Sequence, residues 1–226
     1  SSDALPVPEG VAADFNHGLA SGDPLTDRVI IWTRVTPREQ GFVTVEWEVA
    51  SDDSFANMVA SGRGNTDESV DFTVKVDVTD LSPGSTYFYR FRVLDVVSTT
   101  ARTRTAPAGA TASASFAVVS CSNYPAGYFH VYREVAAQPV DAVLHLGDYI
   151  YEYAPGGYAS ANAEALDRVV QPAGELLSLA DYRTRYAQYR TDPDLQAAHS
   201  AHPFIVVWDD HEIANDAWRE GAENHD

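Results

Sequence analysis

The segment that decides the fold of the first half of the chain reads Val43-Thr44-Val45-Glu46-Trp47-Glu48-Val49. Apolar side chains occupy every second position, which is the period of a β-strand with one buried face. Residues 72–78 repeat the alternation, and further strands are expected at 29–35, 86–94 and 98–105. A series of short alternating strands of this kind predicts an antiparallel β-sandwich.

A turn before one of these strands narrows the type of sandwich. Pro83 and Gly84 precede a strand that opens with Tyr87. This order is typical of a tyrosine corner, in which the hydroxyl group is bonded to the preceding backbone. The segment resembles a fibronectin-III-like module, and we predict that this β-sandwich spans residues 14–107.

The pattern changes after residues 106–115, which consist of small residues and proline with too little apolar side chain to build a core. Nearly continuous apolar runs follow at 116–120, 142–146 and 204–208, with a helical stretch around 129–137. Strands covered on both faces indicate an α/β layered domain, which we place at residues 115–226. We count three core strands where about five or six would be expected, so we expect this domain to be incomplete and the natural protein to continue.

One further helix is expected in this second part. Ser178 and Asp181 have the spacing of a capping box. Tyr182, Tyr186 and Tyr189 follow at helical spacing, which favours packing in a core.

Composition excludes several classes of function. Fifteen basic residues against thirty-three acidic ones give a formal charge of −18, which argues against binding nucleic acid through a basic patch. The single cysteine, Cys121, excludes an intramolecular disulfide. No apolar run is long enough for a transmembrane helix.

Polar residues follow each of the three apolar runs of the second part. Cys121 follows the first run, Gly147 and Asp148 follow the second with Tyr151 close behind, and residues 209–212 follow the third. Ligands bind outside the carboxyl ends of strands in α/β sheets, so these groups can converge on one site. Thiolate, carboxylate and phenolate suit a trivalent metal, and further carboxylates and an amide suit a divalent ion beside it. Asp148 is the natural bridge between two ions because a carboxylate has two oxygens.

Each of these residues also has an ordinary structural interpretation. A single cysteine is usually a packed core residue, and an aspartate after a glycine is often a turn or helix-capping residue. Residues 209–212 could form a solvated loop. The metal-site hypothesis therefore depends on the three strand ends taken together.

Two blocks carry a resemblance to a known family. Residues 147–153, which begin Gly147-Asp148 and include Tyr151, resemble the Gly-Asp-x-x-Tyr block of the PhoD-type alkaline phosphatases and their phosphodiesterase relatives, within the metallophosphoesterase superfamily. Residues 208–212, followed by Asn215, resemble a variant of the superfamily's Gly-Asn-His-Asp/Glu block. Residues 17–24 and 31–34 resemble the start of the family's N-terminal domain, so the resemblance covers essentially the whole chain, as the N-terminal portion of the family.

The resemblance implies a set of roles. Cys121 and Tyr151 would bind iron as Fe3+, Asp148 would bridge, and Asp210 and Asn215 would help to hold divalent ions, with Ca2+ as the first candidate. His211 would be the catalytic residue beside the substrate. The implied activity is hydrolysis of phosphate esters at alkaline pH, and no substrate-binding residue is assigned.

Two rival functions remain at this level. A phospholipase D-type phosphodiesterase could use the same metals, and a non-catalytic calcium-binding adhesion module would fit the sandwich and the acidic charge. The resemblance further implies a secreted, phosphate-scavenging protein, exported by the twin-arginine route. The expected partners are small phosphate esters or phospholipids, together with the C-terminal remainder of the same protein.

Overall fold

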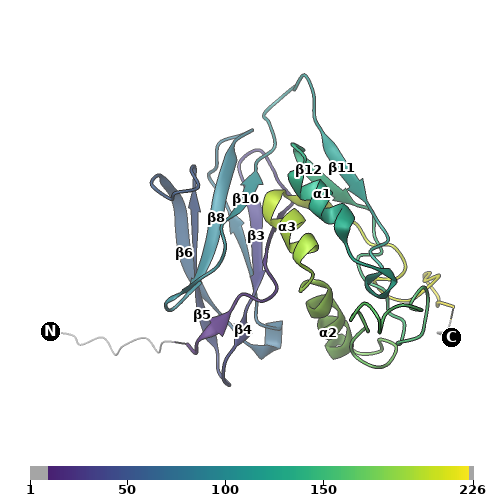
Figure 1. The fold of residues 1–226 in the computed structure, drawn as a ribbon. Coiled ribbons are helices and arrows are strands. Elements are labelled where there is room, and N and C mark those ends of the chain that lie inside the picture. The colour runs from purple at the N-terminus through teal and green to yellow at the C-terminus, as the bar shows by residue number, and fades with distance from the viewer. Residues whose placement is uncertain (1–9, 224–226) are drawn as a thin grey trace.

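The first half of the chain contributes strands to two β-sheets that face each other, as seen in the computed structural model, which describes residues 10–223 (Figure 1). The smaller sheet is antiparallel, with the order β10-β8-β5-β6 and β9 paired to β8. Its strands are β5 (Val43–Ala50), β6 (Met58–Thr66), β8 (Thr86–Val93), β9 (Val96–Val97) and β10 (Ala101–Arg104).

The larger sheet has the order β11-β12-β13-β2-β3-β7. Its strands are β2 (Leu19–Gly22), β3 (Val29–Arg34), β7 (Thr73–Val78), β11 (Phe116–Val119), β12 (Ala142–His145) and β13 (Phe204–Val206). A separate pair joins β1 (Ala13–Asp14) to β4 (Thr36–Pro37).

One core lies between the two sheets of the first half. Val45 and Phe91 from the smaller sheet pack in the same buried cluster as Ile31 and Val78 from the larger one. The tyrosine corner predicted from the turn is confirmed, because the backbone N–H of Ser82 donates to the Tyr87 hydroxyl oxygen at 2.8 Å. The first half is therefore β-rich, as the alternating pattern predicts.

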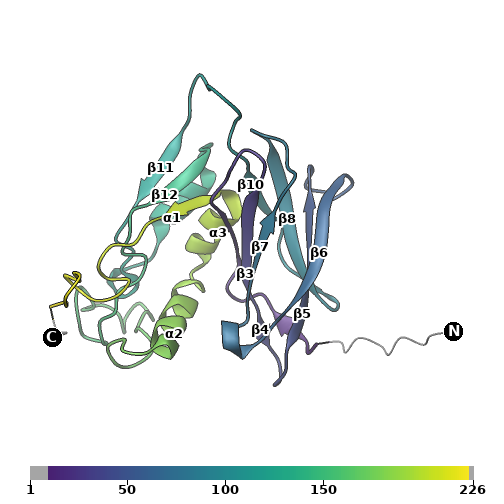
Figure 2. The same cartoon turned by 180° about the vertical axis from the view of Figure 1, so that it is seen from behind.

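A second core lies between the parallel strands β11, β12 and β13 and the helices that cover one face (Figure 2). The helices are α1 (His130–Ala137), α2 (Leu179–Tyr189) and α3 (Pro193–Ala201), and two short 3-10 turns lie at Glu68–Val70 and Tyr124–Ala126. The predicted capping box at the start of α2 is confirmed, since Ser178 accepts from the Asp181 backbone and the Asp181 side chain accepts from the Ser178 backbone. No helix within residues 10–223 is long and apolar enough to cross a membrane.

The two cores share the larger sheet. The composition of residues 106–115 indicates a boundary between two domains but not this shared sheet. Strand β13 lies parallel to β2, with Phe204 opposite Gly22. A Cβ atom at Gly22 would lie 2.8 Å from the Phe204 carbonyl oxygen, so this approach requires glycine. The division at residues 14–107 and 115–226 thus stays a prediction about independent folding, not about separate sheets.

That prediction has a direct test. A chain that ends at Pro107 keeps both faces of the first core, so we expect cooperative thermal unfolding and a dispersed amide NMR spectrum. It loses the pairing of Gly22 with Phe204, the packing of α3 against β2 and β10, and side-chain bonds between the two halves, such as those from Arg190 to Leu19 and from Arg102 to Ala201. A spectrum with collapsed amide shifts would show that the first half depends on β13 for its fold.

Candidate metal centre

The ends of β11, β12 and β13 bring together the groups that the sequence singled out. The three strands are parallel neighbours, so their carboxyl ends lie at one edge of the sheet. Cys121 Sγ lies 3.5 Å from Asp148 Oδ2, and the Tyr151 hydroxyl donates to the same oxygen at 3.1 Å. A thiol, a phenol and a carboxylate from two strand ends therefore meet at one point.

The third strand end adds a carboxylate and an imidazole. Asp148, Asp210 and His211 each place a potential ligand atom within 4.8 Å of the other two. Asp148 is 7% exposed, and its Oδ1 atom is buried without a hydrogen-bond partner among the described residues. A buried carboxylate oxygen without a donor is costly unless a cation binds it. The donor set and this oxygen fit a metal.

The backbone around Asp148 is held in an unusual conformation. Gly147 has φ +99°, and a Cβ atom there would lie 2.4 Å from the Asp209 nitrogen, so the β12 and β13 ends approach closely only because residue 147 is glycine. Asp148 and Cys121 have φ values of 54° and 60°, in the left-handed region that costs energy for residues with a Cβ. Such strain at convergent polar groups is typical of functional sites.

Glu212 holds the backbone at the ends of β12 and β13 in this conformation. Its carboxylate accepts from the backbone N–H of Asp148 at 3.1 Å and of Asp209 at 2.7 Å, and also from the N–H of Tyr149. One buried carboxylate thus ties the end of β12 to the end of β13. The pattern of the sequence alone assigns Glu212 no such role.

Glu152 is a second buried carboxylate, and it holds the imidazole ring of His211. It is 1% exposed, and its Oε2 lies 2.8 Å from His211 Nδ1. Its other oxygen accepts from the backbone N–H of Asn215 at 2.6 Å. A carboxylate in this position fixes the orientation of the imidazole ring and leaves Nε2 for another partner.

The charges of the site affect two of its groups. Burial, together with the nearby Asp148 and Cys121, raises the pKa of Tyr151 far above its ordinary value, so the phenol keeps its hydrogen unless a cation replaces it. Burial would also raise the pKa of Asp210, but the Asp216 backbone N–H and the nearby His211 outweigh this effect and hold the pKa below its ordinary value. Asp210 is therefore an anion at neutral pH.

The structure places most of the candidate residues together. Cys121, Asp148 and Tyr151 are in contact, and Asp210 and His211 lie beside Asp148. The Asn215 side chain instead donates to Glu223, while its backbone bonds to Glu152. Its predicted role as a ligand for a divalent ion stays a prediction.

The role of Glu152 leads to a prediction. In Glu152→Gln an oxygen remains for the Asn215 N–H, but the charge that faces His211 is lost, so we expect kcat to fall roughly ten- to a hundredfold, as for other outer partners of metal sites, with KM little changed. Glu164→Gln, at an exposed position, is the matched control and should keep full activity. Equal kcat values for the two variants would contradict the role given to Glu152.

Comparisons with known proteins agree with this geometry. The sequence pattern of the PhoD-like phosphatase family matches residues 116–226, and that of the N-terminal domain of PhoD-like phosphatases matches residues 2–107. The chain is 41% identical over 210 residues to alkaline phosphatase D of Bacillus subtilis (strain 168), which covers 89% of this chain. A solved structure of PhoD superposes with a TM-score of 0.85 at 40% identity and covers 93% of the chain.

The fold, the strand-end cluster and these matches place the chain in one class: it belongs to the PhoD-like phosphatase family. The resemblance read from residues 147–153 and 208–212 is thereby confirmed. The chain spans 36% of the length of the Bacillus relative and 41% of the solved PhoD chain.

Proposed function

We propose that this chain forms the N-terminal part of a metal-dependent phosphoric ester hydrolase that acts at alkaline pH. The observation that carries the proposal is the convergence of Asp148, Asp210 and His211 at adjoining strand ends, with the Asp148 Oδ1 atom buried and lacking a donor. Membership of the PhoD-like family supports a phosphatase over an adhesion module, because the matched relative is an alkaline phosphatase.

The residues that would hold metal fall into two groups. Cys121, Asp148 and Tyr151 offer the soft and anionic donors that suit Fe3+, and Asp210, with Asn215, offers the oxygen donors that suit Ca2+. Metal ions bound here would supply an activated water and neutralise charge on the phosphoryl oxygens. Asp148, which has two oxygens, would be shared between ions.

The protein's own contribution centres on His211. Its Nδ1 is held by Glu152, so the ring can direct Nε2 to the substrate. There it would stabilise charge on the phosphoryl group or donate a proton to the oxygen of the leaving alcohol. Glu212 contributes indirectly, by fixing the backbone of Asp148.

Hydrolysis assays test the proposal and define its substrate. The full natural chain that contains residues 1–226 is assayed with p-nitrophenyl phosphate, bis-p-nitrophenyl phosphate and phosphatidylcholine vesicles, with and without chelator. Chelator-sensitive turnover of the monoester supports a phosphatase. A strong preference for the diester or the phospholipid supports a phospholipase D-type phosphodiesterase instead. No turnover of any of the three esters would refute the hydrolase.

The iron assignment has a spectroscopic test. Thiolate and phenolate ligands on Fe3+ give a visible charge-transfer band, so the purified full natural chain should be coloured. In Cys121→Ala we expect iron affinity to fall at least tenfold and the band to shift, with little change in the unfolding midpoint because Cys121 is exposed. Iron content and spectrum equal to those of the wild type would remove Cys121 from the ligand set.

The remaining proposals concern context. We infer an extracellular, phosphate-scavenging role with export by the twin-arginine route, and completion of the metal site by a further segment of the same protein. Exposed apolar side chains on β11 and after β12 and β13, including Val118, Leu146 and Val207, support such a segment. We also retain the fibronectin-III-like class for the first half and the metallophosphoesterase layering for the second.

A further inference from the structure

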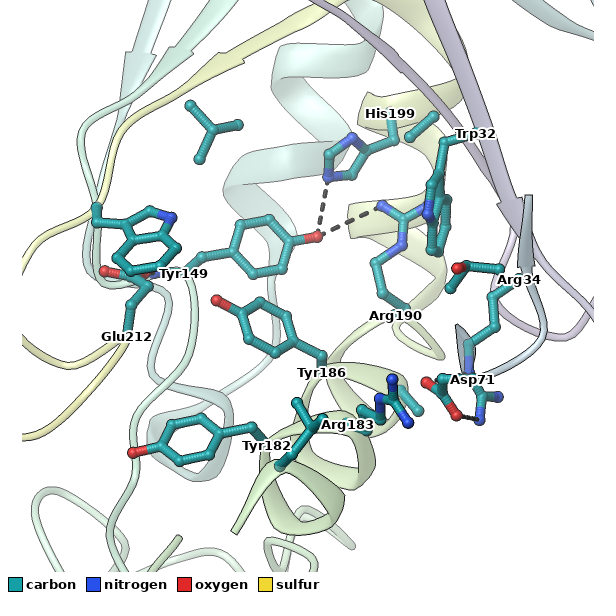
Figure 3. A pocket seen from close by; sticks show the side chains of 16 residues that line it. Trp32, Arg34, Asp71, Tyr149, Tyr182, Arg183, Tyr186, Arg190, His199 and Glu212 are labelled. Atoms are coloured by element: carbon teal, nitrogen blue, oxygen red, sulfur yellow. Dashed lines mark hydrogen bonds and ion pairs between the residues drawn. The ribbon is translucent and has the colours of Figure 1, made fainter. Parts of the chain in front are cut away.

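A cavity lined by none of the proposed metal ligands lies between the larger sheet, α2 and the segment after β13 (Figure 3). Its volume is about 420 Å³, which is within the range of sites for small ligands. The wall is largely apolar and includes the aromatic side chains of Trp32, Tyr182, Tyr186 and Trp208. Tyr182 and Tyr186 pack against the second core, as predicted, and they also line this cavity, whereas Tyr189 is fully buried.

One end of the cavity holds a buried positive charge. Arg190 is 6% exposed and lies against the face of Trp32, with 5.1 Å from the guanidinium carbon to the ring centre. It donates to the Leu19 carbonyl at 3.0 Å and to the Tyr149 hydroxyl at 3.4 Å, and Figure 3 shows Tyr149 joined in turn to His199. The Arg190 Nε atom is buried without a partner, and no ion pair of Arg190 is found within residues 10–223.

The other charged groups around the cavity do not neutralise Arg190. The Asp71 carboxylate forms a bidentate ion pair with the Arg34 guanidinium, with N···O distances of 2.8 and 2.9 Å. The Glu212 carboxylate is already occupied by three backbone N–H groups. Arg183 also lines the cavity, and it donates to a carbonyl oxygen, that of Ser69. In a chain with a formal charge of −18, this cavity is locally positive.

A buried guanidinium without a counter-ion is costly, and the cost is relieved when a carboxylate accepts its free N–H. The aromatic walls add stacking and apolar contact for a flat body attached to that carboxylate. A phosphate dianion would need more donors than this apolar cavity presents. We propose that the cavity binds an aromatic monocarboxylate, with its carboxylate at Arg190 and its ring beside Trp32 and Tyr186.

The test compares two probes of nearly the same shape, one with an anionic carboxylate and one with a neutral amide. Binding of 2-naphthoate and of neutral 2-naphthamide is measured by calorimetry on the full natural chain that contains these residues, so that no surface covered by another segment is taken for a free site. We expect naphthoate to bind at least about tenfold more tightly than the amide, because the amide cannot form the charged bond to Arg190.

Two variants locate the binding. Arg190→Met should remove the preference for the carboxylate, while Arg63→Met, at an exposed position on β6, should keep it. Ala187→Leu fills the cavity from α2 without touching the bonds of Arg190 and should weaken naphthoate binding at least tenfold. It therefore decides the question even if Arg190→Met fails to fold.

Three results would overturn the proposal. Absence of naphthoate binding would mean that the protein's own chain fills or closes the cavity. Equal affinity for the two probes would mean that Arg190 does not recognise the carboxylate. Unchanged affinity in a folded Ala187→Leu would place the bound naphthoate elsewhere.

Discussion

Replacing Asp148 with asparagine is expected to lower metal affinity by more than about a hundredfold and to abolish measurable phosphoester hydrolysis. Loss of an outer partner of a metal ligand costs roughly ten- to a hundredfold, and Asp148 is itself the central carboxylate of the cluster. Asparagine keeps the shape and an acceptor for the Tyr151 hydroxyl, but it lacks the charge that binds a cation. Metal content after dialysis and kcat/KM measure the two effects.

The matched control is Asp209→Asn, which removes an exposed carboxylate from the neighbouring strand end and should leave metal content and activity unchanged. The unfolding midpoint of metal-free Asp148→Asn should also stay near that of the wild type, because the buried Oδ1 atom has no protein donor to lose. Retained metal in Asp148→Asn would show that the centre lies elsewhere.

Replacing Arg185 with methionine is expected to have the largest effect on stability, about 3 kcal/mol or more. Arg185 is fully buried, and its guanidinium donates to the carbonyl oxygens of Gln171, Tyr151 and Tyr153. Methionine leaves these three carbonyls without that donor. Two of them, those of Tyr151 and Tyr153, flank Glu152 in the chain. The unfolding midpoint of the full natural chain should fall by a few degrees, because the shift per kcal/mol decreases as a chain becomes longer.

Arg183→Met is the control for this change. It lies two residues earlier in α2 and makes one backbone bond, to Ser69 at 2.9 Å, so its effect should stay below about 1 kcal/mol. If Arg185→Met unfolded at the same temperature as Arg183→Met, the carbonyls of Gln171, Tyr151 and Tyr153 would have found other donors. The loops that carry them would then not depend on the Arg185 side chain of α2.

Strands with a clear local pattern were predictable, and those shaped by a partner strand were not. Residues 43–50 form β5 within the range expected from their alternation. Strand β6, beside it, has no alternating apolar pattern, and its Gly62 is set by the neighbouring strand, because a Cβ there would lie 2.6 Å from the Trp47 ring of β5. Helix α3 lies outside the helices expected from the sequence, although Asp192 caps it and Pro193 stands at its first position, which is a recognisable helix start.

The candidate site divides in the same way. Cys121, Asp148, Asp210 and His211 follow apolar strands directly, so the rule for parallel strand ends brings them together without knowledge of the loops. The partners that orient them could not be found so simply. Glu152 reaches His211 across 59 positions in the chain, and Arg185 reaches residue 151 across 34, so their roles exist only after the loops have folded.

Gly22, which lies opposite Phe204, also limits which N-terminal halves can be exchanged between related proteins. Because a Cβ at position 22 would lie only 2.8 Å from the Phe204 carbonyl oxygen, a sandwich taken from another protein could pair with β13 at this edge only if it had glycine there. Any other residue would force the two halves apart and leave the end of β13 unpaired on that side. Exchange of the N-terminal half between family members should therefore succeed when the donor carries glycine at the matching position, and fail when it does not.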